Sequence, residues 1–283
     1  MGSGCGNNKV VDNVNNDEIK VNDSIAEDLK ADDKQKSEDK VETVTYDPVL
    51  KVDADLALKL DIPILMFHYI EDVPSDSNDQ MRYNLSYSPA NLENLLISLR
   101  DNEIETLTFW DIKAIAEGSK KQPDQAVILT FDDGHNNHYS AAYPLLKKYD
   151  MKGVFFIISG KPGNDDNYAT WEQIAEMAEY GMEIGSHTVN HLNLAELSET
   201  DLIQELNDSK ELIEENVGVP VIGLCYPAGK YSENVMRIAE EYYLFARTTQ
   251  NGYEIDWQNR YEMPTVRMFP TTSPNLMDGW WEE

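Results

Sequence analysis

From Ile62 onward, short and almost wholly apolar runs alternate with segments whose apolar residues recur at helical spacing. Runs such as AVILTF and GVFFII show little alternation with polar residues, which is typical of parallel strands covered on both faces. Strands are predicted over 62–70, 126–131, 153–158, 182–187, 220–227, 244–249 and 265–269. The repeated strand–helix order predicts a mostly parallel α/β fold, and about seven such units suffice to close a barrel.

The intervening helices have start and stop signals. Ser-Pro at 88–89 opens one of them, and Thr170 with Gln173 has the spacing of a capping box. Gly218 is placed to end the longest helix. The predicted helices therefore begin just after Ser88, Thr170, Ser198 and Ser232.

The first stretch of the chain has a different composition. Residues 1–61 hold 15 Asp/Glu and 8 Lys/Arg, and Tyr46 is their only aromatic residue. Such a segment cannot bury enough apolar surface to offset chain entropy, so residues 1–60 are expected to form a disordered acidic tether and 61–283 the folded domain. Cys5 follows Gly4 as the lipid-accepting cysteine of a bacterial lipoprotein does, which favours an extracellular, lipid-anchored location; the alternative is a free cysteine.

Charge and cysteine content exclude several classes of protein. A net charge of −29 argues against nucleic acid or an anionic membrane surface as a partner. No run of 18 apolar residues occurs, so any membrane attachment is expected through the N-terminal anchor alone. Cys5 and Cys225 lie in unrelated contexts and do not indicate a disulfide framework. We expect a monomer.

Polar residues gather where the predicted strands end. His68 closes the first apolar run, Asp132-Asp133 ends the second, and SHTVNH (186–191) and CYPAGKYS (225–232) follow two later strands. All five histidines of the chain fall on or beside three of these strand ends. Because catalytic groups cluster at the carboxyl ends of parallel strands, this pattern predicts one functional site.

The residue types indicate a metal site. His187 and His191 are four residues apart, which on a helical turn places both imidazoles on one face; the alternative is an exposed turn. Of Asp132 and Asp133, one can bind a cation while its neighbour accepts a proton; the alternative is an Asx-turn completed by Gly134. Two imidazoles and a carboxylate leave positions open for water and substrate, and a bound cation lowers the pKa of water to about 7. Metal-assisted hydrolysis of an amide or ester is predicted.

TFDDG followed by SHTVNH resembles the first two motifs of the polysaccharide deacetylases, the NodB-homology domains or family-four carbohydrate esterases. The resemblance extends over roughly residues 60–270 and implies a deformed (β/α)7 barrel. It implies Asp132 as the general base. It also implies Asp133, His187 and His191 as ligands of a divalent metal, usually zinc and sometimes cobalt or nickel.

The third motif departs from the form Arg-Pro-Pro-Tyr-Gly that many members have, in which the Arg orients the catalytic Asp. Alignment on Gly229 places Cys225 at the Arg position and Ala228 at the Tyr position. The resemblance implies that the backbone N–H of Ala228 helps to hold the oxyanion. Arg247 or Arg267, each on a late strand, is a candidate to replace the missing Arg.

The YPxGxY loop and the LMFHY opening resemble the poly-β-1,6-N-acetylglucosamine deacetylase branch, in which the acid histidine lies on the first strand. This implies His68 as the general acid; the alternative is a core histidine that caps a strand. His135 and His138 are expected at the rim or at a helix start rather than as ligands. The aromatic residues that either line a sugar-binding cleft or belong to the core are Tyr226, Tyr231 and Trp171.

The resemblance implies a metal-dependent enzyme that removes N-acetyl groups from N-acetylglucosamine units of a cell-surface polysaccharide. The alternatives with the same site are a peptidoglycan or chitin-type deacetylase and an acetylxylan esterase. An alternative of another class is an inactive carbohydrate-binding lipoprotein, which the missing third-motif Arg would favour.

Overall fold

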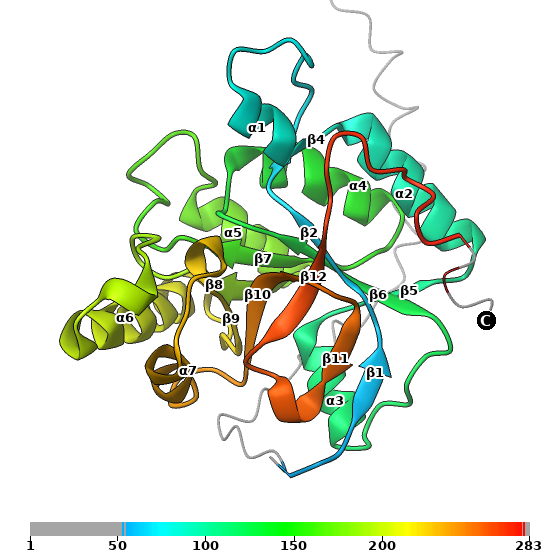
Figure 1. The fold of residues 1–283 in the computed structure, drawn as a ribbon. Helices are drawn as coiled ribbons and strands as arrows, with labels where there is room; N and C mark the ends of the chain where they lie inside the picture. The colour runs from blue at the N-terminus through cyan, green and yellow to red at the C-terminus, as the bar shows by residue number, and fades with distance from the viewer. Residues whose placement is uncertain (1–52, 54, 279, 281–283) are drawn as a thin grey trace, which may run out of the picture. The chain divides into compact units, whose positions relative to one another are not determined.

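Within the described residues, seven parallel strands close into a barrel (Figure 1). The computed structural model describes residues 53, 55–278 and 280. Around the ring the order is β2–β12–β10–β9–β8–β7–β6, and β6 pairs again with β2. The strands are β2 Ile64–Phe67, β6 Ala126–Phe131, β7 Val154–Ile157, β8 Glu183–Ser186, β9 Gly223–Cys225, β10 Phe245–Asn251 and β12 Met263–Arg267. The predicted barrel is confirmed, and each strand falls within or close to its predicted range.

Short strands lie beside the ring. β5 (Glu105–Leu107) pairs with the first half of β6 and was not predicted. β1 (Lys59–Asp61) and β11 (Glu254–Asp256) form an antiparallel pair, and β3 (Tyr69–Ile70) pairs with β4 (Ser86–Tyr87).

All the described α-helices except α4 (Tyr143–Lys148) begin at a side-chain cap. Ser88 accepts the N–H of Asn91, and Thr170 and Gln173 form the expected capping box. The helices are α1 Gln80–Leu85, α2 Pro89–Asp101, α3 Phe109–Ala116, α4 Tyr143–Lys148, α5 Trp171–Glu179, α6 Glu199–Val217 and α7 Glu233–Ala239, with the shorter turns η1 His138–Ala142, η2 Leu194–Glu196, η3 Pro227–Gly229 and η4 Trp257–Asn259. No described helix has both the length and the apolar character needed to cross a bilayer.

The two faces of each barrel strand belong to different parts of the core. On β6, Val127, Leu129 and Phe131 pack with the surrounding helices. Ala126 and Ile128 instead pack inside the barrel, in a cluster that α3 helps to form. Because successive side chains point to opposite faces, a strand buried on both sides must be apolar at every position. This explains the continuous apolar runs of the sequence.

The domain begins earlier than residue 61. Leu60 has no exposed surface, and the indole N–H of Trp257 donates to the carbonyl of Asp53 at 2.9 Å. The segment just before residue 61 therefore packs on the barrel: Leu60 pairs with Ile255 of β11, and Leu56 and Leu58 are partly buried against the core. The rest of the predicted tether, residues 1–52 and 54, lies outside the described residues, and so does Cys5.

A buried carboxyl lies at the amino-terminal end of β8. Glu183 Oε2 accepts the backbone N–H of Phe109 at 2.7 Å, at the start of α3. Burial raises the pKa of Glu183 from 4.5 to about 8, although the N–H groups of α3 oppose this shift. Between pH 4.5 and about 8, Glu183 therefore holds a proton in the folded protein that it has lost in the unfolded chain.

We therefore predict that Glu183 makes the free energy of unfolding fall with rising pH. Its contribution is complete below about pH 4.5 and is lost as pH rises through about 8, with a slope near 1.4 kcal/mol per pH unit. Glu183→Gln keeps an oxygen to accept the Phe109 N–H and should flatten this dependence. Urea unfolding of both proteins from pH 5 to 8 measures it, and parallel curves would contradict the prediction.

Candidate active site

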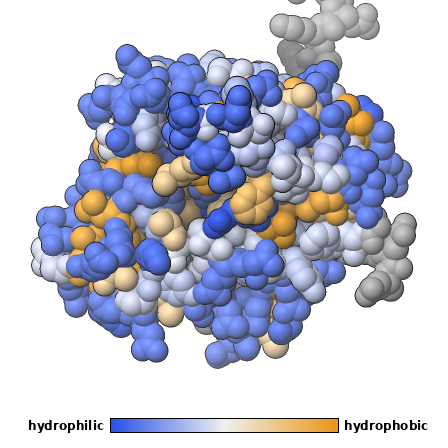
Figure 2. Space-filling model, turned by 45° about the horizontal axis from the view of Figure 1, so that its top comes forward, coloured by the Kyte–Doolittle hydropathy of each residue, from blue (hydrophilic) through white to orange (hydrophobic). Residues whose placement is uncertain are grey.

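The polar strand ends meet at the carboxyl-terminal mouth of the barrel. His68 follows β2, Asp132 and Asp133 follow β6, and the segment 187–191 follows β8. Because the strands are parallel neighbours in one closed sheet, their carboxyl ends lie together. Figure 2 tilts the top of the Figure 1 view forward and shows a mainly hydrophilic face with small hydrophobic patches near its middle.

Asp132 points into the barrel because of its place in the strand register. Ile128 and Thr130 face inward on β6, and Asp132 is the next residue of that series; its N–H continues the sheet by donating to Phe67 at 2.9 Å. Its side chain is only 2% exposed. Burial opposes ionisation, but the Arg247 guanidinium and nearby imidazoles outweigh it and hold the pKa of Asp132 below its usual range.

Arg247 supplies the guanidinium that the third motif lacks. It lies on β10 with no exposed surface, and its Nη2 donates to Asp132 Oδ1. The same nitrogen lies 2.8 Å from the sulfur of Cys225, the small residue that stands at the expected Arg position. Arg267, the other candidate, is exposed and lies over the Phe269 ring. Burial therefore distinguishes Arg247 from Arg267 as the replacement for the missing third-motif Arg.

Asp133, His187 and His191 converge on one another. Asp133 Oδ1 lies 3.4 Å from His187 Nε2 and 3.6 Å from His191 Nε2. One ligand atom from each of the three residues lies within 4.8 Å of the others. The expected helical turn is wrong: residues 187–191 form a loop in which Thr188 and His191 have φ of 64° and 58°. The loop, rather than helical spacing, brings the imidazoles together.

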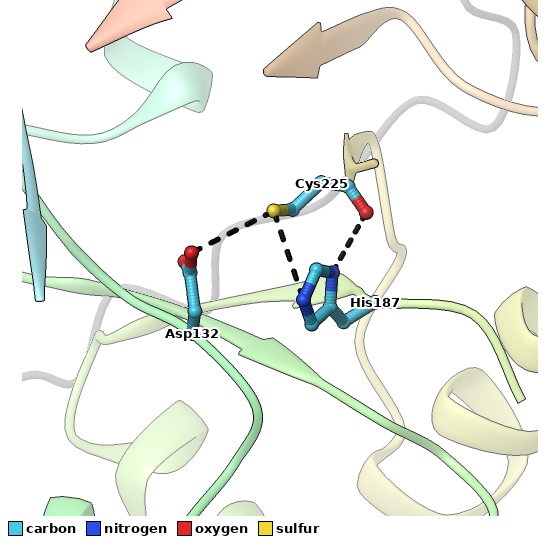
Figure 3. Close-up of side chains that lie close together, drawn as sticks. All are labelled: Asp132, His187 and Cys225. Atoms are coloured by element: carbon cyan, nitrogen blue, oxygen red, sulfur yellow. Dashed lines mark hydrogen bonds between the residues drawn. The ribbon is translucent and has the colours of Figure 1, made fainter. Parts of the chain in front are cut away.

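This donor set fits a divalent cation. His187 Nδ1 donates to the carbonyl of Cys225 at 2.7 Å, which leaves Nε2 as the nitrogen that faces Asp133. Burial lowers the pKa of His187, but contacts with Cys225 and Asp133 outweigh it and raise the pKa well above its usual value. A proton and a cation therefore compete for Nε2. Figure 3 shows His187 and Asp132 on either side of the Cys225 sulfur.

His135 and His138 are buried and do not lie at the rim. His135 Nε2 lies 3.2 Å from Asp133 Oδ2, the carboxylate oxygen that His187 and His191 do not face, and its ring stacks on Tyr69. His138 begins η1, as a helix-start residue should, and its Nε2 donates to the carbonyl of His68. Burial lowers the pKa of His138 to about 3, so it is neutral. The sequence analysis missed the contact of His135 with Asp133, for which its position two residues later was the available signal.

His68 lies at the mouth beside Asp132. Its Nε2 is 3.8 Å from Asp132 Oδ2, and its side chain is 18% exposed. Burial lowers the pKa of His68, while the two Asp carboxylates oppose the shift. A lower pKa makes the imidazolium a stronger acid and reduces its protonated fraction at neutral pH.

The loop after β9 and the predicted aromatic residues differ in exposure. Ala228 is exposed with φ 51°, and Gly229 follows at φ 66°, where a Cβ would clash with Thr249 Oγ1. Tyr226 has no exposed surface and stacks on Tyr231, so it offers no face to a sugar in this structure. Tyr231 and Trp171 are partly buried against the core. Their role in sugar binding stays a prediction.

A cavity of about 230 Å³ adjoins the cluster formed by Asp133, His187 and His191. His135 forms part of its wall and thereby connects it to Asp133. The remaining lining residues are polar or aromatic: Tyr69, Arg82, Asn137, Asp165, Asn167 and Tyr168.

Comparisons with known proteins find a matching family model, similar sequences and a similar fold. Residues 119–244 match a family model described as polysaccharide deacetylase. YxkH of Bacillus subtilis, which carries the name of a polysaccharide deacetylase, is 34% identical over 222 residues, or 78% of this chain and 76% of its own. The poly-β-1,6-N-acetyl-D-glucosamine N-deacetylase of Staphylococcus aureus MSSA476 is 23% identical over 211 residues, 70% of this chain and 72% of its own. The structure of Streptococcus pyogenes deacetylase PplD in complex with acetate superposes with a TM-score of 0.71 and 30% identity, covering 78% of this chain and 98% of that one.

We predict that Arg247→Met removes the guanidinium that pairs with the buried Asp132 carboxylate. The pKa of Asp132 should rise, and the free energy of unfolding should fall by about 3–5 kcal/mol at neutral pH. Urea denaturation measures the loss. Arg267→Met is the matched control and should change stability by less than about 0.5 kcal/mol, as surface substitutions do. Equal losses in both variants would show that Arg247 has no special role.

Proposed function

The chain belongs to the polysaccharide deacetylase family, and on that premise we propose that it removes N-acetyl groups from N-acetylglucosamine units of a poly-β-1,6-linked surface polysaccharide. The observation that carries the proposal is the pair Asp132 and Asp133: one buried carboxylate held by Arg247, the next facing two imidazoles. The linkage is supported by the likeness to the S. aureus deacetylase and by the place of His68, directly after the first barrel strand.

In the proposed reaction each residue has a separate task. Asp132 accepts the proton of the attacking water, because its depressed pKa keeps it ionised and Arg247 fixes its orientation. His68 gives a proton to the leaving nitrogen. The backbone N–H of Ala228 donates to the oxyanion that forms on the acetyl carbonyl. Backbone donation at residue 228 does not depend on the side chain, so an Ala can serve where many relatives have a Tyr.

Asp133, His187 and His191 would hold the divalent cation, which we propose is zinc, with cobalt or nickel as alternatives. When bound, the cation acts as a Lewis acid that acidifies water and polarises the acetyl carbonyl. His135 and the Cys225 carbonyl orient two of these ligands through their hydrogen bonds.

The alternative of an inactive carbohydrate-binding protein rested on the missing third-motif Arg. Arg247 reaches Asp132 from another strand, so that reason no longer holds. The cluster also combines three ligand groups with a separate carboxylate, which a binding protein does not need.

The substrate is tested by acetate release from oligomers of β-1,6- and β-1,4-linked N-acetylglucosamine, with acetylxylan and peptidoglycan fragments as further arms. We expect turnover of the β-1,6 oligomers, its loss with a chelator and its return with zinc. Faster release from another polymer would replace the proposed substrate and keep the chemistry. No release from any arm, in protein shown to contain metal, would contradict the proposed activity.

Substitutions should separate the base from the ligands. Asp132→Asn should retain zinc and lower kcat by about 10²-fold or more, whereas His187→Ala should lose both zinc and activity. His68→Ala should lower kcat and keep zinc. Metal analysis and kinetics on the same preparations provide the measurement. Near-normal turnover of Asp132→Asn would reject it as the base.

We also propose that the protein acts at the cell surface through a lipid on Cys5. With the same lipoprotein signal sequence placed ahead of both proteins, Cys5→Ser should move the protein from the membrane fraction to the medium. An unchanged distribution would contradict the anchor without affecting the proposed chemistry.

A further inference from the structure

Glu205 holds the loop that carries both histidines of the cluster. It lies on α6 and is 5% exposed. Its Oε2 accepts the backbone N–H groups of Val189 at 3.0 Å and Asn190 at 2.9 Å, and its Oε1 accepts the Asn190 side-chain N–H at 2.6 Å. One buried carboxyl from a helix thus binds the middle of the segment between His187 and His191.

This loop needs such a partner. Thr188 and His191 are non-glycine residues in the left-handed region, which side chains disfavour. Within the loop, the His191 N–H donates to Thr188 Oγ1 at 3.1 Å. The N–H groups of Val189 and Asn190 point the other way, toward α6. Two successive N–H groups converging on one acidic oxygen form a small anion-binding concavity, which here is filled by the protein itself.

The histidines are not fixed equally by other contacts. His187 is 2% exposed and is oriented by the Cys225 carbonyl, but the His191 side chain is 36% exposed. The position of His191 relative to Asp133 therefore depends strongly on the conformation of the loop. That conformation is the one that the Glu205 hydrogen bonds select.

We propose that Glu205 is a positioning residue that sets the separation of His187 and His191 for metal binding. The inference rests on the proposed function only in requiring that these histidines bind a cation. It assigns Glu205 no contact with substrate. Its effect should appear in the affinity for the metal, in the absence of any substrate.

The test compares Glu205→Gln with Glu211→Gln, the same substitution at an exposed position of the same helix. In Glu205→Gln the new side chain would turn an amide NH₂ toward donors and could not accept all three hydrogen bonds. Zinc affinity is measured by competition with a chromogenic chelator, and the melting temperature of the metal-free protein is measured in parallel. We expect zinc binding to weaken on the order of tenfold or more in Glu205→Gln and to stay unchanged in Glu211→Gln.

Asn190→Ala is the second variant, because it removes only the contact to Oε1 and should fold even if Glu205→Gln does not. We expect a smaller weakening of zinc binding in the same direction. The visible spectrum of the cobalt-loaded protein should also change in both variants, since ligand geometry changes. A role limited to stability would lower the melting temperature of the metal-free protein and leave both the zinc affinity and the cobalt spectrum unchanged.

Zinc affinity within about twofold of the unaltered protein in the folded variants would overturn the proposal, because a positioning residue is expected to change it on the order of tenfold. Because the readout uses no substrate, this outcome is distinct from failure of the deacetylase proposal. Normal zinc binding without acetate release would instead reject the enzyme function and leave the role of Glu205 to be judged on the affinities alone.

Discussion

The ion pair between Asp132 and Arg247 is the interaction on which the site depends. Both side chains are almost wholly removed from water, so each would be costly to bury alone. The barrel accepts them because each continues the inward series of its own strand, Asp132 after β6 and Arg247 within β10. Cys225, on the strand beside β10, leaves space for the guanidinium. The pair keeps a carboxylate ionised inside an apolar interior.

The two adjacent carboxylates, one of which belongs to that pair, face different partners. Asp132 points inward to the guanidinium, and Asp133, at φ 79°, turns toward His187 and His191. Each cluster residue also has a partner of its own: His135 for Asp133, the Cys225 carbonyl for His187, and Glu205 for the loop. These partners come from different strands and helices, so the fold as a whole fixes the arrangement.

Much of the fold could be predicted because both faces of the barrel strands are buried. This requirement appears in the sequence as apolar runs, and the cap residues Ser88, Thr170 and Ser198 mark the helix starts. β5 was missed because its three residues are too short to show a period. α3 was missed although Thr108 and Asp111 form a readable capping box.

The sequence by itself determined the barrel, the strand ends that meet at its mouth, and the set of residues with suitable chemistry. These depend on hydrophobic period and on residue type, which are local properties of the chain. Tertiary structure alone decided between Arg247 and Arg267, buried His135 and His138, and joined Glu205 to a loop fifteen residues earlier in the chain. These outcomes depend on which side chains become buried together, and burial is a property of the closed barrel and its helices rather than of any one segment.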